Sequence, residues 1–179
     1  MLDNSLQKLS RSAKNANKLV KHVGRALKSD LFYDEWKKVI KAKNPSENVV
    51  RYNGARWWIV IYAMRQIRDN LDSLKEIASR LKNSKYKKTL GKIVKMLDSD
   101  DKMKGIKKQL VHVTCYGEEL CGVGNILEGD GFLILRAYDL LSKLKKNISK
   151  SVLKTKIEAF GVAYDENLYK ASHEVNFLL

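Results

Sequence analysis

Apolar residues recur at alternating steps of three and four along most of this chain. The spacing is clearest near the N-terminus, after residue 55 and after residue 102. Residues at these steps lie on one face of an α-helix, so each stretch predicts an amphipathic helix. The 179 residues include one proline, Pro45, so few positions interrupt a helix. We therefore expect an all-α fold, an irregular multi-helix bundle of six to eight helices, with enough chain to bury a core.

Two helices are expected before Pro45. The apolar residues of the first run from Leu6 to Leu27, and basic residues lie off this face, which predicts a basic outer surface. Ser29 or Asp30 can cap the second helix, because both side chains accept hydrogen bonds from a first helical turn. Lysines near the end of the second helix suit the helix dipole.

The third helix is expected to run without a break from about Ala55 to about Leu81, about seven turns. It opens with Arg56, Trp57 and Trp58. We expect Trp58 in the core, whereas burial and exposure are equally expected for Trp57. The apolar face of this helix comprises Trp57, Ile61, Met64, Ile67, Leu71, Leu74, Ala78 and Leu81.

A short helix is expected across residues 86–97, and a long one across 103–127. The long helix carries Gly117, Gly122 and Gly124. Each glycine destabilises a helix by roughly 1 kcal/mol relative to alanine. A close approach of another helix, or a bend, would explain them.

A turn at residues 128–131 precedes an expected helix over 132–148. One or two short helices are expected after Ser151, where the apolar pattern is weaker. The residues expected to point inward from the helix over 132–148 are Leu133, Ala137, Leu140, Leu141, Leu144 and Ile148.

The net charge of +15 is concentrated in the first part of the chain. Residues 1–110 hold 27 Lys and Arg against 11 Asp and Glu, a net +16, whereas residues 111–179 hold 8 against 9, a net −1. A surface of one sign attracts a polymer of the other, so the first part could bind an anionic polymer such as DNA. A lysine-rich surface that only contacts solvent explains the same charge, because lysine runs alone are weak evidence for nucleic-acid binding.

The segment from Lys82 to Lys95 is basic throughout. It carries no acidic residue and one tyrosine, Tyr86. Lysines bind phosphate groups through their charge, so this segment is suited to contacts with a nucleic-acid backbone. Its basic residues are Lys82, Lys85, Lys87, Lys88, Lys92 and Lys95.

No group of residues predicts catalysis or a bound cofactor. The sequence lacks a Ser-His-Asp signature, GxSxG and HExxH motifs and a P-loop, so we expect no enzyme activity from this chain alone. His112 and Cys115 could share a metal ion, but no second pair completes a zinc site. We assign no catalytic or metal-binding residue and expect no cofactor. Glu118 and Glu119 are expected to be surface charges.

Cys115 and Cys121 are too few for a disulfide framework, which favours a reducing compartment. The N-terminal residues lack the apolar core of a signal peptide, and no apolar run approaches the length of a membrane-spanning helix. We therefore expect an intracellular protein, nuclear if its source is eukaryotic, with no membrane association.

Three ordered segments resemble the hAT superfamily of transposases and proteins derived from them. The first is LVKHVGRALKSDLFYDEWKKV, residues 19–39. The second is Arg56-Trp57-Trp58 at the start of a long helix, and the third is LEGDGFLILRAYDLLSKL, residues 127–144. The three segments in this order make the resemblance more specific than the Arg-Trp pair by itself, and together they cover about residues 2–149.

In such transposases a helical insertion interrupts a ribonuclease H-like catalytic core. The resemblance implies that residues 1–150 correspond to this insertion, and that residues 151–179 are a C-terminal helical tail at the edge of a truncated core. The family's Arg-Trp motif lies near transposon-end DNA, where the Trp stacks on an unpaired base. By this match Trp57 would stack on a base, worth roughly 1–3 kcal/mol, and Arg56 would support it or bind a phosphate.

Two neighbours of the motif depart from the family pattern, because Ala55 stands where Thr or Ser is usual and Ile59 where Ser is usual. The match identifies none of the family's catalytic carboxylates, so it implies a DNA-associated domain that is not catalytic by itself. The alternative is a helical protein-interaction or structural remnant with no nucleic-acid role, binding another protein or a second copy of itself. The expected nucleic-acid-binding residues are Arg56, Trp57, Lys82, Lys85, Lys87 and Lys88.

Overall fold

The computed structural model describes residues 13–52, 57–81, 86–128 and 134–173. Within these ranges the regular structure is entirely α-helical, which confirms the all-α prediction. The side chains at positions 57, 124–128, 134–137 and 171–173 lie outside the described part. The nine helices of the described ranges are α2 (Lys14–Ala26), α3 (Asp30–Lys43), α4 (Trp57–Asp69), α5 (Leu71–Arg80), α6 (Lys87–Met96), α7 (Asp100–Glu128), α8 (Ile134–Asn147), α9 (Lys150–Glu158) and α10 (Glu166–His173).

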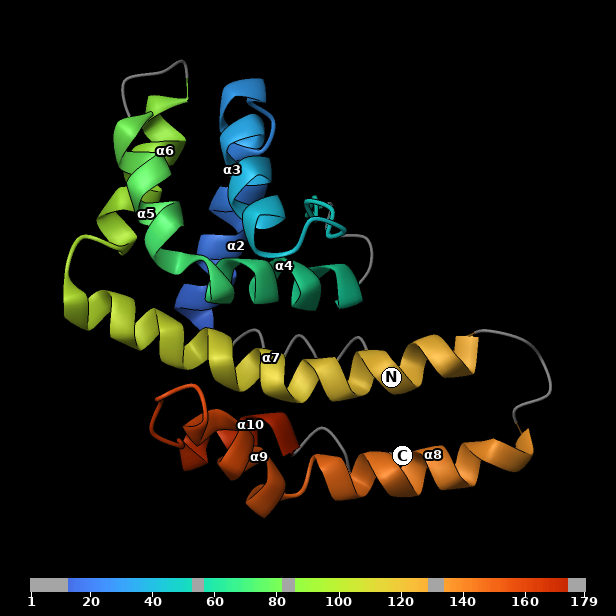
Figure 1. Cartoon of the computed structure of the whole chain (residues 1–179). Coiled ribbons are helices and arrows are strands. Elements are labelled where there is room, and N and C mark those ends of the chain that lie inside the picture. The colour runs from blue at the N-terminus through green and yellow to red at the C-terminus, as the bar shows by residue number, and fades with distance from the viewer. Residues whose placement is uncertain (1–12, 53–56, 82–85, 129–133, 174–179) are drawn as a thin grey trace.

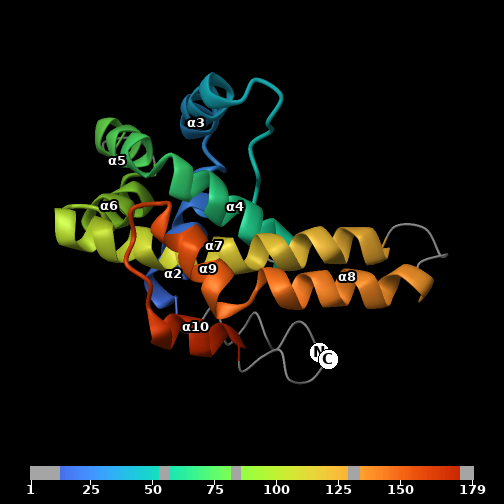
Figure 2. The same ribbon diagram turned by 60° about the horizontal axis from the view of Figure 1, so that its bottom comes forward.

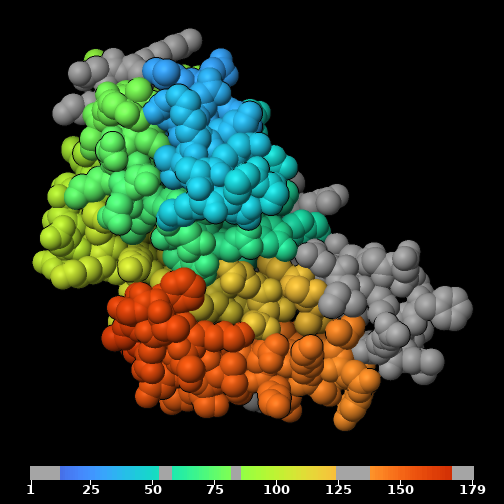
Figure 3. All heavy atoms as spheres, in the orientation of Figure 1, coloured from blue at the N-terminus to red at the C-terminus, as the bar shows by residue number. Residues whose placement is uncertain are grey.

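Helix α7 runs through the middle of the molecule (Figure 1). It has 29 residues and is therefore about 43 Å long. Helices α2 to α6 lie on one side of α7, and α8 to α10 lie on the other (Figures 1 and 2). Every residue from 110 to 117 is buried, because helices cover this part of α7 on both sides. Figure 3 shows the C-terminal helices packed directly against α7.

Four helices form a group on one side of α7. In Figure 1, α3 and α5 lie in front of α2 and α6, and the rotated view of Figure 2 agrees. Helix α2 packs on α6, α6 on α5, and α5 on α3. The largest side chains buried in this group, Phe32 and Trp36, come from α3. Each aromatic ring of this size removes about 150–250 Å² from water, so these two side chains contribute much of the apolar burial in this group.

The prediction of a single long helix from about Ala55 to about Leu81 is wrong, because Asn70 divides this stretch into α4 and α5. Asn70 has φ −131° and ψ 30°, outside the helical range. Its side-chain amide donates to the carbonyl of Gln66 at 2.9 Å, where the backbone N–H of residue 70 would bond in a continuous helix. That N–H donates to Ile67 instead, at 3.2 Å. Helix α4 then lies along α7, whereas α5 turns away to pack on α3 and α6 (Figure 1). The division also makes the number of helices larger than expected.

Helices α4 and α7 approach each other closely at Gly117, which is the first of the two explanations that the sequence left open for this glycine. A Cβ atom at this position would lie 2.5 Å from Cδ1 and 2.9 Å from Cγ1 of Ile61 on α4. Gly122 does not fit this explanation, because nothing lies within 4 Å of the corresponding position there. Gly124 lies in the part of α7 whose side-chain surroundings are not described.

The N-terminus of α2 is capped by a residue of another helix. Oε1 of Gln109, on α7, accepts hydrogen bonds from the backbone N–H groups of Asn15 and Ala16 at 3.1 and 3.0 Å. The first N–H groups of a helix have no partner within it, so Gln109 both satisfies α2 and ties it to α7. Ser29, by contrast, caps α3 locally as expected, with its hydroxyl accepting from the N–H of Phe32.

Helix α8 covers α7 with one face only. Leu144 and Ile148 are buried as expected, but Leu141 is 41% exposed, so its inward orientation was wrongly predicted. Tyr138 is 78% exposed on the same helix. Among the described helices, α8 packs on α7 and α9, and Tyr138 and Leu141 are not covered by either (Figure 2). The expected inward residues Leu133 and Ala137, and most of the turn at 128–131, lie outside the described part.

The two short C-terminal helices, α9 and α10, pack on α7. Lys156 of α9 pairs with Glu119, and Lys108 of α7 pairs with Asp165 before α10 at 2.7 Å. Gly161, in the turn after α9, has a φ of +67°, a conformation that favours glycine. The expectation of one or two short helices after residue 151 is therefore confirmed.

We predict that Gly117→Ala destabilises the protein by about 1–3 kcal/mol, because the added methyl group overlaps Ile61 and pushes α4 away from α7. Gly105→Ala, on the same helix, is the matched control. Nothing lies within 4 Å of its added methyl group, so it should stabilise the protein by about 1 kcal/mol. Urea unfolding measures both changes. Equal effects of the two substitutions would contradict the close approach.

Candidate nucleic-acid interface

Helix α2 presents a row of cations on its outer face. The row occupies five positions separated by alternating steps of four and three, so the side chains line one side of the helix. All five are exposed, and α2 contains no acidic residue. The opposite face buries Leu19 and Val23 against the rest of the protein. The members of the row are Lys14, Lys18, Lys21, Arg25 and Lys28, the last just beyond the helix end.

Helix α6 carries a second set of cations. Lys88, Lys92 and Lys95 follow one another at steps of four and three, and Lys87 lies at the helix start. All four are exposed, while Leu90 is buried on the other side. This helix also contains no acidic residue.

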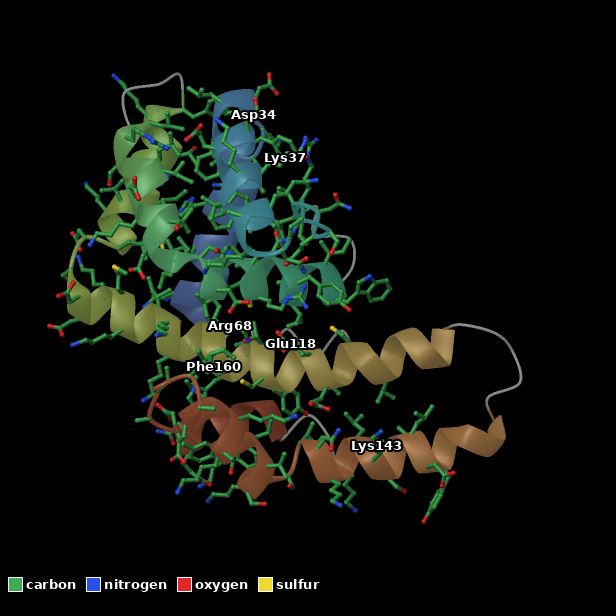
Figure 4. The ribbon with its side chains drawn as sticks, viewed as in Figure 1. Asp34, Lys37, Arg68, Glu118, Lys143 and Phe160 are labelled. Carbon is green, nitrogen blue, oxygen red and sulfur yellow. The ribbon has the colours of Figure 1, made fainter. Side chains whose placement is uncertain are left out.

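The two sets lie on helices that pack against each other, and we call the nine residues the α2–α6 basic surface. None of the nine forms an ion pair with another described residue. The neighbouring pair of helices, α3 and α5, differs because it does form ion pairs. There Glu35 pairs with both Lys38 and Arg80, and α3 exposes Asp34 beside Lys37 (Figure 4). The α2–α6 basic surface is thus a face on which no ion pair between described residues compensates the cations, unlike the face of α3 and α5.

The two sets of cations meet near His22. It lies on α2 beside the row, is 7% exposed, and its Nδ1 atom has no hydrogen-bond partner among the described residues. Burial lowers the pKa of His22, and the charges of Lys92, Arg25 and Lys18 lower it further. Two of these cations belong to α2 and one to α6, so the positive potential comes from both helices at this point.

A polar contact also fixes the far end of this surface. The hydroxyl of Tyr86, just before α6, donates to the backbone carbonyl of Lys28, just after α2, at 3.2 Å. The end of α2 and the start of α6 are therefore held together, and the cations on both helices share a rigid support.

The predicted site residues fall into three groups. Lys87 and Lys88 are exposed on α6 and belong to the basic surface. Arg56, Lys82 and Lys85 lie outside the described residues. Trp57 opens α4, but its side chain is likewise outside the described part. Its neighbour Trp58, expected in the core, is only half-buried and packs against the core from outside. The structure thus brings Lys87 and Lys88 together with the cations of α2. The sequence did not predict that these two basic segments are neighbours.

Arg68 is a buried charge for which the sequence predicted no role. Its side chain is 6% exposed between α4, α7 and the segment after α9 (Figure 4). The guanidinium donates to both carboxylate oxygens of Asp69 at 2.7 and 3.2 Å, to the hydroxyl of Thr114 at 2.6 Å and to Glu118 at 3.3 Å. It also lies 4.4 Å from the ring centre of Phe160. These contacts join α4, α7 and the segment after α9.

The titration of the groups around Arg68 agrees with a structural role. Burial opposes the charge of Arg68, but its hydrogen bonds to Asp69 and the charge of Glu118 outweigh burial and raise its pKa. Burial raises the pKa of Glu118, which the charge of Arg68 only partly offsets. Burial also raises the pKa of the Cys115 thiol to about 11 and that of Cys121 to about 12, so both thiols stay protonated at neutral pH.

His112 holds the C-terminal segment on α7. Its Nε2 accepts a hydrogen bond from the backbone N–H of Asp165 at 2.9 Å, so the proton is on Nδ1, which donates to the carbonyl of Lys108 at 2.9 Å. Both ring nitrogens are therefore used within the protein. Among the described residues, no three His, Cys, Asp or Glu side chains are grouped as a metal ion would require. No helix of that part of the chain is long and apolar enough to cross a membrane.

Glu119, expected to be a surface charge like Glu118, is instead part of an inter-helix contact. It pairs with Lys156 and accepts a hydrogen bond from the side chain of Asn147 at 2.8 Å. Burial raises the pKa of Glu119, but these bonds outweigh burial and lower it overall.

A surface hollow of about 380 Å³ lies at the break between α4 and α5. Its charged lining includes Lys43, Lys104 and Lys107 but also Asp69, Asp72 and Asp100. The two signs compensate each other, so this hollow lacks the uniform charge of the α2–α6 basic surface.

Comparisons with known protein families, with curated proteins and with solved structures found no match to this chain.

We predict that Lys92→Gln raises the pKa of His22, because it removes a cation of α6 from beside a histidine of α2. The value should stay below 6.5, since burial is the larger cause. Neutral His22 favours folding above pH 6.5, and this contribution is lost as the pH falls below that value, because the unfolded chain binds the proton more readily. An NMR titration of the His22 ring measures the pKa, with Lys87→Gln as the control that should leave it unchanged. An unchanged pKa in Lys92→Gln would show that the two cation sets do not meet at His22.

Proposed function

We propose that this chain is a DNA-associated helical domain that binds the phosphate backbone through the α2–α6 basic surface. The observation that carries the proposal is a face of nine exposed cations on two packed helices that contain no acidic residue. Phosphate contacts supply much of the affinity of DNA-binding proteins, and exposed lysines provide such contacts. The described part of the chain groups no residues that suggest catalysis, so binding is the function that fits this face best.

The resemblance to hAT transposases supports the same proposal from a different part of the chain. It assigns a base-stacking role to Trp57 and a supporting or phosphate-binding role to Arg56. Trp57 is the first residue of α4, and α4 is held rigidly along α7 at Ile61. A side chain at the start of a fixed helix is suited to a stacking contact, because the backbone that carries it does not need to be ordered on binding.

We predict that the affinity for a DNA duplex falls steeply with salt. Each phosphate contact contributes about −0.9 to the slope of log K against log salt concentration. The triple variant Lys18→Gln, Lys21→Gln and Arg25→Gln should reduce the magnitude of this slope by up to about 3 and weaken binding. Fluorescence anisotropy at several salt concentrations measures both quantities.

The control for this experiment is a second triple variant on α8: Lys143→Gln, Lys145→Gln and Lys146→Gln. These lysines are exposed, and the change in net charge is the same (Figure 4 shows Lys143). The control should leave the slope nearly unchanged, because α8 lies across α7 from the basic surface. Equal effects of the two triple variants would show that overall charge, not this surface, determines binding.

We predict that Trp57→Ala weakens binding to hairpin or flapped DNA more than binding to a plain duplex. The expected loss is up to about 1–3 kcal/mol for the hairpin, because one stacked base is lost. Trp58→Ala provides no control, since Trp58 packs against the core. Trp57→Phe provides the control, because it keeps an aromatic ring and should retain most of the preference for hairpin DNA over plain duplex. A loss of the same size on both DNAs would contradict the stacking role.

A protein-binding role is the second candidate, and Tyr138 and Leu141 favour it because both are exposed on α8. The salt experiment distinguishes the two candidates. If the chain shows no salt-dependent binding of any DNA, the DNA-binding role is contradicted and the protein-binding role is favoured.

A further inference from the structure

The arrangement of the cations, beyond their number, constrains which form of DNA they fit. Along α2, neighbouring cations are three or four residues apart, a rise of about 4.5–6 Å, and the row from Lys14 to Lys28 extends over about 21 Å. A DNA strand in a duplex places one phosphate about every 3.4 Å along its axis. Because the strand also winds around this axis, its successive phosphates lie farther apart than about 3.4 Å, and a straight row of about 21 Å faces fewer than about six of them. The five cations of the α2 row are therefore enough to contact the phosphates that the row faces on one strand.

The cations of α6 make a second, shorter row. Lys88 and Lys95 are about 10 Å apart along the helix axis, with Lys92 between them. The axes of two packed helices are about 8–10 Å apart, and the minor groove of a duplex separates its two backbones by about 6 Å. Flexible lysine side chains on the two helices can therefore reach the two backbones at the same time.

The same surface lacks the groups that bind single strands. Proteins that bind single-stranded nucleic acids combine cations with exposed aromatic rings on which bases stack. The exposed large apolar side chains of the described chain are Leu31, Tyr138, Leu141 and Phe160, and none lies on α2 or α6. The hydroxyl of Tyr86, at the edge of this surface, is bound to the Lys28 carbonyl and the residue is half-buried.

The surface also lacks a set of base-reading side chains. Eight of its nine cations are lysines, and Arg25 is the exception. Lysine acts on phosphate as a point charge, whereas the planar fork of arginine and the amides of Asn and Gln read base edges.

We propose that the α2–α6 basic surface binds the sugar-phosphate backbone of double-stranded DNA, with α2 on one strand and α6 on the other, independently of base sequence. This inference rests on the proposed DNA association and specifies the form of DNA that the surface recognises. Trp57 plays no part in it, because its position at the start of α4 is outside the surface.

The test compares four ligands of equal length with the full chain at one salt concentration: a mixed-sequence duplex of 24 base pairs, a duplex of shuffled sequence, one strand of the first duplex, and the corresponding RNA duplex. We expect both DNA duplexes to bind equally, and the single strand to bind at least about tenfold more weakly, because one row of contacts loses its partner. The RNA duplex should bind more weakly than DNA, since its minor groove is wide and shallow.

Two triple variants test the assignment of one row to each strand. The α2 variant carries Lys18→Gln, Lys21→Gln and Arg25→Gln, and the α6 variant carries Lys88→Gln, Lys92→Gln and Lys95→Gln. Each should reduce the salt slope on the duplex by up to about 3, and circular dichroism should show that both remain folded. Combining them should add their effects on log K.

Three outcomes would overturn the inference: a single strand or RNA duplex bound as tightly as the DNA duplex, a difference between the two DNA sequences, or an effect confined to one of the two rows. These outcomes differ from failure of the proposed function itself, in which none of the four ligands is retained in a salt-dependent way.

Discussion

The packing of α4 on α7 at Gly117 is the contact on which the rest of this structure depends. The absence of a side chain at Gly117 lets Ile61 approach the backbone of α7, and the contact fixes α4 along the central helix. Because Asn70 ends α4, α5 is then directed away from α7, towards α3 and α6. Gln109 ties the start of α2 to the same central helix. On this side, α4 and α2 are thus placed by contacts with α7, and α3, α5 and α6 are placed by packing on one another and on α2.

This packing also decides where the charge lies. Helices α2 and α6 bury their apolar faces against the group that includes α3 and α5, so their cations face outward together. On α3 and α5, carboxylates such as Glu35 pair with cations, whereas α2 and α6 contain no acidic residue. Mutual repulsion among nine cations costs stability in the free protein, and a polyanion would relieve it. Burial is the main cause of the lowered pKa of His22, and the charges of Lys92, Arg25 and Lys18 lower it further.

The buried polar groups of the molecule serve a different purpose. Arg68 and His112 each join α7 to the segment that follows α9, through Phe160 and Asp165 respectively. Their hydrogen bonds are satisfied within the protein, and removing one partner would leave a buried polar group unpaired, at a cost of about 1–3 kcal/mol or more for a charge. Reactive chemistry is not needed to explain these residues. The same holds for Glu118 and Glu119, whose ion pairs link α7 to α4 and α9.

The sequence by itself determined the helical class, most of the helix positions and the excess of positive charge before residue 110, because these follow from the spacing and identity of neighbouring residues. It offered a close approach or a bend as explanations for Gly117, and only the structure decided for the close approach. It could not show that Asn70 breaks a helix whose apolar spacing continues unchanged, since the break depends on a side chain taking one backbone carbonyl. Nor could it show that Leu141 faces solvent or that Lys87 and Lys88 join the cations of α2. Those facts were decided only by the tertiary structure, because a helix face is buried or exposed according to which other helices reach it.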